Sequence, residues 1–198
     1  MDLGTFARKE DGGKNYDAAK EISDLDKTRF QHFASLLSAG KTPLEITDDI
    51  QRKRWEKIVW NVAWNSLTAL TMLDTQAWLA TSAESLNLTR QVMEEVVAVA
   101  EACAVPIPAK PSQTIGSNTQ GSHTSGNDFV EALVEKTLKL PGIRSSMMVD
   151  RELGRPMEVE LIVGTPVKKA RQHGVPIPRL EMLYALLLAT NAKSTKEN

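Results

Sequence analysis

The sequence predicts an all-α fold, a bundle of helices built around one core. Apolar residues recur at spacings of three and four in several long segments, which is typical of helices with one buried face. The alternation of buried strands and helices that marks a parallel sheet is absent. The chain has 198 residues, of which 41% are hydrophobic and 25% charged, so it is long enough to bury a sizeable core.

The N-terminal part contributes one firm helix. Residues 1–23 are polar, although the segment LGTFA (3–7) has the composition of a short strand. A helix is expected over 24–39, because Asp24 can cap its start and its apolar residues share a face. Residues 41–47 are expected to be extended, as a proline within them requires.

Two longer helices follow. Asp48 or Asp49 caps a long helix that is expected to reach about Leu73. Another helix is expected over 87–104, where apolar residues again recur every three or four positions, and Pro106 ends it.

The next segment lacks the residues that form a core. Residues 109–127 are low in complexity and polar, so we expect a flexible loop there. A helix resumes over 128–140. Ser145 can cap a short helix that Gly154 ends.

The last part begins with an ambiguous stretch. Within 157–173, MEVELIV could be a strand, whereas VKKARQHG is helical in pattern, with Pro166 as a kink between the halves. Gly174 is a helix stop. A final helix is expected from Pro178 to about Asn191. The helical domain is therefore expected over 24–192, followed by a polar tail, 193–198.

Composition argues against several classes of partner. The formal net charge is −1, from 24 basic and 25 acidic residues, so no broad basic field is available for nucleic acid or an anionic membrane. The longest apolar run is too short to span a bilayer, and the first residues lack the apolar core of a secretory signal. A single cysteine forms no internal disulfide, which favours a reducing compartment. We therefore expect a soluble, cytoplasmic protein. No metal is expected, since the three histidines lack metal-ligand spacing.

The long central helix carries a polar strip within an apolar run, WEKIVWNVAWNSLTAL. Lys57, Asn61 and Asn65 are four residues apart and so lie on one helix face. An ammonium and two carboxamides in partly dry surroundings could bind and protonate a small oxygenated molecule. Taken singly, each has a structural reading: a solvated lysine, and buried amides that satisfy neighbouring backbone groups.

A second polar cluster lies in SSMMVDRELGRPMEVE (145–160). Ser145 and Ser146 open a helix, where free backbone N–H groups attract anions. Glu158 follows among apolar neighbours, after a Gly-Arg-Pro turn. Ser145 alone reads as a helix cap and Glu158 alone as a surface carboxylate.

Together these motifs resemble the C-terminal domain of the ketopantoate reductase (2-dehydropantoate 2-reductase) family. That domain carries the patterns K-x-x-x-N-x-x-x-N-P-L-T-A-L, S-S-M-x-x-D-x-x-x-G-R-x-T-E and R-x-H-G-V-x-x-P in this order. The matching positions run over about 24–190: Lys57, Asn61, Asn65-Ser66-Leu67-Thr68-Ala69-Leu70; Ser145-Ser146-Met147, Asp150, Gly154-Arg155-Pro156-Met157-Glu158; and Arg171-Gln172-His173-Gly174-Val175-Pro176-Ile177-Pro178.

The resemblance implies a helical domain like the C-terminal domain of 6-phosphogluconate dehydrogenase, one that packs on a nucleotide-binding domain and often dimerises. It implies reduction of 2-dehydropantoate with NADPH, a pantothenate-pathway reaction. Lys57 would be the general acid, protonated at neutral pH because a lysine pKa is about 10.4. Asn61 and Asn65 would bind substrate oxygens, and Ser146 its carboxylate or a hydroxyl. Glu158 would contact the substrate hydroxyl and the cofactor side, and help to keep Lys57 charged.

The sequence departs from the family in three places. Ser66 replaces the usual proline, and Met157 the threonine before Glu158. No G-x-G-x-x-G occurs, so the N-terminal Rossmann domain is expected to be absent, with residues 1–23 as a candidate remnant. NADPH would then bind only where a Rossmann domain is supplied, and this chain alone would bind no cofactor.

Three functional hypotheses stay open. The chain is the catalytic half of a ketopantoate reductase-like enzyme, inactive in redox chemistry without a Rossmann domain in cis or trans. Alternatively, it is a standalone helical dimerisation or interaction module. The third hypothesis is a cofactor-free acid–base enzyme that acts on a carbonyl substrate through Lys57 and Glu158. The expected partners are a small 2-keto acid, a second copy of the chain and a separate Rossmann domain.

Overall fold

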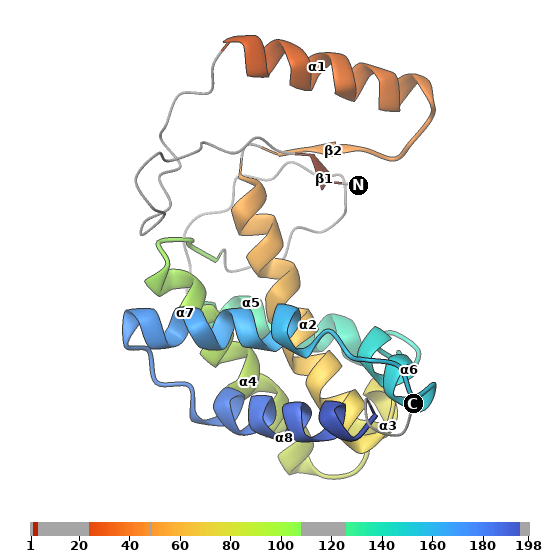
Figure 1. Ribbon diagram of the computed structural model, residues 1–198, viewed down its shortest axis with the longest axis vertical. Coiled ribbons are helices and arrows are strands. Elements are labelled where there is room, and N and C mark those ends of the chain that lie inside the picture. The colour runs from red at the N-terminus through yellow and green to blue at the C-terminus, as the bar shows by residue number, and fades with distance from the viewer. Residues whose placement is uncertain (1, 4–23, 48, 108–125, 195–198) are drawn as a thin grey trace.

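The expected all-α bundle is confirmed. The computed structural model describes residues 2–3, 24–47, 49–107 and 126–194, and most of these residues are helical (Figure 1). Helix α2 (Ile50–Thr71) runs through the centre of the bundle and packs against α4 (Ala83–Ala102), α6 (Ser146–Glu152) and α8 (Pro178–Ser194). Within the described ranges, no helix is long and apolar enough to cross a membrane.

The N-terminal elements lie apart from the bundle, at the top of Figure 1. Helix α1 (Asp24–Ala39) forms as expected, and the extended segment after it contains strand β2 (Glu45–Ile46). Strand β1 (Asp2–Leu3) pairs with β2 in parallel. The strand expected over 3–7 is thus described only at its start, and the rest of the segment 1–23 lies outside the described residues.

Helix α2 begins as the sequence predicts. Asp49 caps it, because its carboxylate accepts the backbone N–H of Arg52 at 2.9 Å. The helix continues unbroken past Ser66, the position at which the family pattern has proline. Met72 closes the helix in a left-handed conformation, with φ 58°. The face of α2 toward the core is fully buried at several positions: Val59, Val62, Ala63, Trp64 and Ala69.

The region after α2 corrects two expectations. Residues Thr75–Leu79 form a short helix, α3, that the sequence did not predict, capped by Asp74. Helix α4 begins at Ala83, four residues before the expected start at 87, because Ser82 supplies a cap for the N–H of Ser85. Each of these two helix starts depends on one capping side chain, so the periodicity of the apolar residues did not reveal it.

The following helices lie close to their expected positions. Helix α5 (Gly126–Leu138) begins two residues earlier than expected, and the loop predicted at 109–127 otherwise lies outside the described residues. Ser145 caps α6 as predicted, accepting the backbone N–H of Met148 at 3.1 Å.

The ambiguous stretch is helical from Val159 onward, so its strand reading is wrong, and Met157 and Glu158 have no regular structure. A π-helix, η1 (Glu160–Gly164), continues directly into α7 (Thr165–His173), which ends at Gly174 with φ 67°. Pro166 is the second residue of α7, and the helix continues through it from η1. A Cβ at position 164 would lie 2.8 Å from Glu160 Oε2 of η1 and 3.3 Å from the Tyr184 side chain of α8, so glycine leaves room for both side chains.

A surface network joins η1, α7 and α8. Lys168 Nζ donates to Glu160 at 2.7 Å, and the Tyr184 hydroxyl donates to the same carboxylate at 2.6 Å. These hydrogen bonds, first that of Lys168 and then that of Tyr184, lower the pKa of Glu160. The bond to Glu160 raises the pKa of Tyr184. The network holds the π-helix against the last helix.

Candidate functional site

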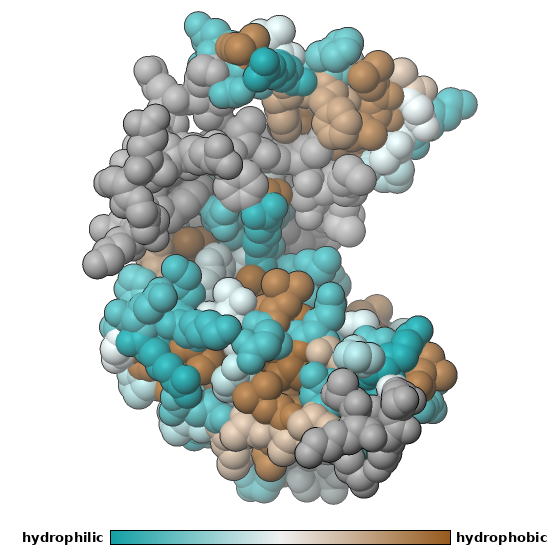
Figure 2. All heavy atoms as spheres, viewed as in Figure 1, coloured by the Kyte–Doolittle hydropathy of each residue, from teal (hydrophilic) through white to brown (hydrophobic). Residues whose placement is uncertain are grey.

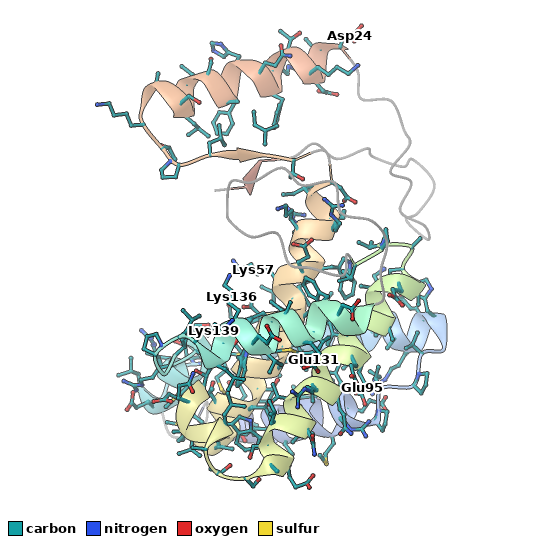
Figure 3. The ribbon with its side chains drawn as sticks, turned by 180° about the vertical axis from the view of Figure 1, so that it is seen from behind. Asp24, Lys57, Glu95, Glu131, Lys136 and Lys139 are labelled. Atoms are coloured by element: carbon teal, nitrogen blue, oxygen red, sulfur yellow. The ribbon has the colours of Figure 1, made fainter. Side chains whose placement is uncertain are left out.

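The polar strip runs along α2 from solvent into the core. Lys57 is exposed and projects from the upper part of α2 (Figure 3), Asn61 is half-buried, and Asn65 is 3% exposed. Among the described residues, the side chains of Lys57 and Asn61 form no hydrogen bond or ion pair. The Lys57 ammonium at the exposed end of the strip, and the Asn61 amide closer to its buried end, therefore remain available to a ligand.

Asn65 and Ser146 are brought into direct contact although they lie far apart in the sequence. The Ser146 hydroxyl donates to Asn65 Oδ1 at 3.1 Å, and the backbone N–H of Met147 donates to the same oxygen at 3.2 Å. Asn65 thus caps the beginning of α6 from a neighbouring helix. This agrees with the structural alternative given for Asn65, a buried amide that satisfies a neighbouring backbone group. Its amide nitrogen has no partner among the described residues and stays free for a ligand.

Glu158 lies in the segment between α6 and η1 and is exposed. Its position is set by its neighbour Met157, whose backbone N–H donates to Asn191 Oδ1 at 2.8 Å. The described part of the chain shows no ion pair between Glu158 and Lys57. The described hydrogen bonds and ion pairs do not join the Glu158 side chain to the strip on α2, so its place in the site stays a prediction.

The sequence alone assigned no role in the site to Thr68 or Arg151, which attach α6 to α2. Thr68 contacts Ser145 through their hydroxyl oxygens at 2.6 Å, and both side chains are buried. Arg151 of α6 donates to the carbonyls of Ala69 and Leu70 at the end of α2. The signal for Thr68 was its position three residues after Asn65, on the same helix face.

The departures from the family pattern have small local effects. Ser66 is fully buried, and its hydroxyl has no hydrogen-bond partner among the described residues. Met157 is 5% exposed, so its side chain packs in the core in place of a polar contact. Neither change alters the strip on α2.

The ammonium and carboxamides of the strip are hydrogen-bond donors of the kind that bind a small oxygenated molecule. The described ranges contain no group of three or more His, Cys, Asp and Glu side chains that could hold a metal ion. A shallow cleft of about 450 Å³ lies between α3 and α4, lined by residues such as Trp78, Ser82 and Leu88, and includes none of the predicted site residues.

Comparison with known proteins points to one family. Residues 49–191 match the family model described as "Ketopantoate reductase PanE/ApbA C terminal". The 2-dehydropantoate 2-reductase of Nostoc sp. is 30% identical over 156 residues, which cover 79% of this chain and 43% of that relative.

Solved structures agree with this match. A crystal structure of 2-dehydropantoate 2-reductase from Methylococcus capsulatus has 34% sequence identity and a TM-score of 0.67, covering 83% of this chain and 52% of that one. The corresponding enzyme from Geobacter metallireducens has 31% identity and a TM-score of 0.68, covering 82% and 48%. This chain thus spans about half the length of the relatives that it matches.

Proposed function

Because the chain belongs to the ketopantoate reductase family through that family's C-terminal domain, we propose that it is the substrate-binding half of an NADPH-dependent 2-keto-acid reductase. 2-Dehydropantoate, on which the relatives are named as acting, is the proposed substrate. The observation that supports this proposal most directly is the hydrogen bond between Ser146 and Asn65, at the buried end of the strip that bears Lys57. Catalysis requires a Rossmann domain in cis or trans.

The residues of the strip have separate tasks in this proposal. When it is bound, NADPH supplies a hydride to the ketone carbon. Lys57 delivers a proton to the ketone oxygen as negative charge develops there, and its own charge stabilises that oxygen. Asn61 and the amide nitrogen of Asn65 donate hydrogen bonds to substrate oxygens. Glu158 accepts a hydrogen bond from a substrate hydroxyl at the open side of the site.

Cofactor binding is not assigned to this chain. The sequence contains no G-x-G-x-x-G turn to cradle a pyrophosphate, and Glu158 is the one residue proposed to approach the cofactor. The described N-terminal elements nevertheless suit a neighbouring Rossmann sheet. Strand β1, helix α1 and strand β2 form a parallel β-α-β unit, and two parallel strands are too few to be stable alone. Further parallel strands would complete that unit.

We therefore expect reductase activity only when the two halves are combined. The probe is the N-terminal part of the Nostoc relative, produced separately and mixed with this chain, NADPH and 2-dehydropantoate. Oxidation of NADPH should depend on both polypeptides. If this chain alone oxidised NADPH with the keto acid, the need for a second domain would be disproved. If the mixture bound but stayed inactive, the reductase proposal would be lost.

A second copy of the chain is the other proposed partner. Apolar side chains gather on the face of the bundle formed by η1, α7 and α8 (Figure 2). Three of the large ones are well exposed: Leu161 at 66%, Met182 at 53% and Leu186 at 48%. Water-exposed apolar groups in one patch favour association. This patch also favours the second candidate function, a helical dimerisation module.

The two candidate functions make different predictions for two variants. Leu161→Lys should shift the chain from dimer to monomer in analytical ultracentrifugation, because it places a charge in the apolar patch. Lys57→Ala should leave the dimer unchanged. If the biological activity survives Lys57→Ala but is lost in Leu161→Lys, the interaction module is the correct function. A wild-type chain that stays monomeric at high concentration would exclude this dimer surface.

A further inference from the structure

The cleft between α3 and α4 plays no part in the proposed reaction. It has a volume of about 450 Å³ and is lined by an indole, a leucine, three hydroxyl groups, one carboxylate and one carboxamide. Helix α3 lies at the lower end of the bundle (Figure 1), whereas Lys57 projects from the upper part of α2 (Figure 3). A ligand in this cleft would therefore bind at a site separate from the polar strip.

The three hydroxyl groups of the cleft have already used their hydrogens. Thr81 Oγ1 donates to the carbonyl of Trp78 at 2.7 Å, because a carbonyl can only accept. Ser85 Oγ lies 2.5 Å from Thr81 Oγ1 and must therefore donate to it. Ser82 Oγ, 3.1 Å from Ser85 Oγ, donates to Ser85 in turn. The two exposed hydroxyls, those of Thr81 and Ser82, thus offer a ligand lone pairs and no hydrogen.

The indole of Trp78 leaves only ring surface to the cleft. Its single N–H donates to Thr89 Oγ1 at 3.0 Å, and Thr89 Oγ1 donates to the carbonyl of Ser85 at 2.7 Å. This pair of hydrogen bonds holds the N–H edge of the ring against α4. Trp78 is half-buried, so part of its ring stays open to a ligand. The face of an aromatic ring attracts cations, because its π electrons carry partial negative charge.

The charge on the cleft wall is negative. Glu84, in the first turn of α4, is exposed and forms no hydrogen bond or ion pair with the described residues. The carboxamide oxygen of Gln91 accepts Nε of Arg179 at 2.8 Å, and Arg179 is itself paired with Glu95 at 3.2 Å. The positive charge behind the cleft is therefore neutralised. Among the described lining side chains, the amide nitrogen of Gln91 is the one hydrogen-bond donor still available.

The start of a helix would by itself attract an anion, but this one is already occupied. The backbone N–H of Ser85 donates to Ser82 Oγ at 3.2 Å. The Glu84 carboxylate places a negative charge in the same turn. An anionic ligand is therefore disfavoured, and the cleft favours a ligand that donates hydrogen bonds and carries positive charge.

We propose that this cleft binds a small organic ammonium ion, a primary amine that carries an apolar ring or chain. The ammonium donates to the Glu84 carboxylate and to the free lone pairs of Thr81 and Ser82. The apolar part packs on Trp78 and Leu88. An ammonium has three hydrogens to donate and no acceptor, which matches a wall made almost entirely of acceptors. The proposal does not depend on the reductase reaction, so each can fail without the other.

Three ligands that share one ring test the sign of the ligand charge: benzylamine, which is protonated at neutral pH, benzyl alcohol and benzoate. The indole N–H signal of Trp78 in the full chain, assigned by its loss in Trp78→Phe, is followed by NMR during each titration. Benzylamine should move this signal and bind about tenfold more tightly than benzyl alcohol, through the ion pair and the cation–π contact together. Benzoate should not bind.

A matched pair of variants tests the carboxylate. Glu84→Gln removes the charge and keeps the shape, so it should weaken the binding of benzylamine about threefold and leave that of benzyl alcohol unchanged. Because Glu84 is exposed, the variant should fold as the wild type does. Glu101→Gln removes the same charge from an exposed position near the other end of α4 and should change neither affinity.

Four results would overturn the proposal. Equal affinities for benzylamine and benzyl alcohol would show that the charge is not recognised, and tighter binding of benzoate would assign the cleft to anions. A Trp78 signal that none of the three ligands moves would show that the cleft binds none of them. Equal losses in Glu84→Gln and Glu101→Gln would show that the effect comes from the overall charge of the protein.

Discussion

Replacement of Lys57 by alanine is expected to lower the kcat of the combined enzyme by about 100- to 10,000-fold, the usual contribution of a general acid. The reduced ketone needs a proton as the hydride arrives, and among the described residues of the strip only Lys57 carries a proton on a cationic group. Steady-state NADPH oxidation at saturating substrate measures the effect. The melting temperature should not change, because Lys57 is exposed and its side chain has no hydrogen bond or ion pair in the described part of the chain.

Two further variants separate proton donation from charge. Lys57→Arg keeps the positive charge, but a guanidinium does not release its proton, so kcat should stay low while KM stays close to that of the wild type. Lys136→Ala removes the same charge from an exposed position on α5 (Figure 3) and should retain full activity. If Lys57→Ala kept wild-type kcat, Lys57 would not be the acid, and the solvated-lysine interpretation would hold.

Replacement of Glu95 by alanine is expected to lower the free energy of unfolding by about 3 kcal/mol, as breaking a buried charged network does. Glu95 is 8% exposed and holds the start of α8. Its carboxylate accepts the backbone N–H groups of Arg179 and Leu180, at 3.2 and 2.8 Å, and one guanidinium N–H of Arg179 at 3.2 Å. Alanine would leave these donors unsatisfied. For a domain of this size the change corresponds to about 6–12 °C in Tm, measured by calorimetry.

The control is an exposed carboxylate on a neighbouring helix. Glu131 of α5 (Figure 3) pairs with Arg90 at 2.6 Å, but its side chain is 49% exposed, so water screens the pair. Glu131→Ala should cost less than about 1 kcal/mol. Equal losses for the two variants would show that Glu95 acts as an ordinary surface charge.

Loss of the Glu95 contact should also weaken substrate binding. The C-terminal end of α8 carries Asn191, whose side chain accepts the backbone N–H of Met157, the residue before Glu158.

The sequence was sufficient where structure is decided by neighbouring residues. Asp49, Ser145 and Gly174 end or begin helices through their own side chains or backbone freedom, and each lies where its local pattern predicted. The strip of Lys57, Asn61 and Asn65 follows from helical spacing alone. The motifs also identified the family, because ordered residues at particular separations resemble that family whether or not their contacts are known.

Tertiary packing decided the rest. MEVELIV has a pattern compatible with strand or helix, and it is helical from Val159 onward, where Val159 and Val163 lie one turn apart and are both buried. The contact of Asn65 with Ser146 joins residues 81 positions apart, so neither its existence nor the direction of its hydrogen bonds can be read from spacing. Sequence thus determined most of the helices and the polar residues that they carry, but not α3 or the start of α4. The folded structure decided which of their atoms are occupied by other helices and which remain free to bind a ligand, because each polar atom forms only as many hydrogen bonds as its hydrogens and lone pairs allow.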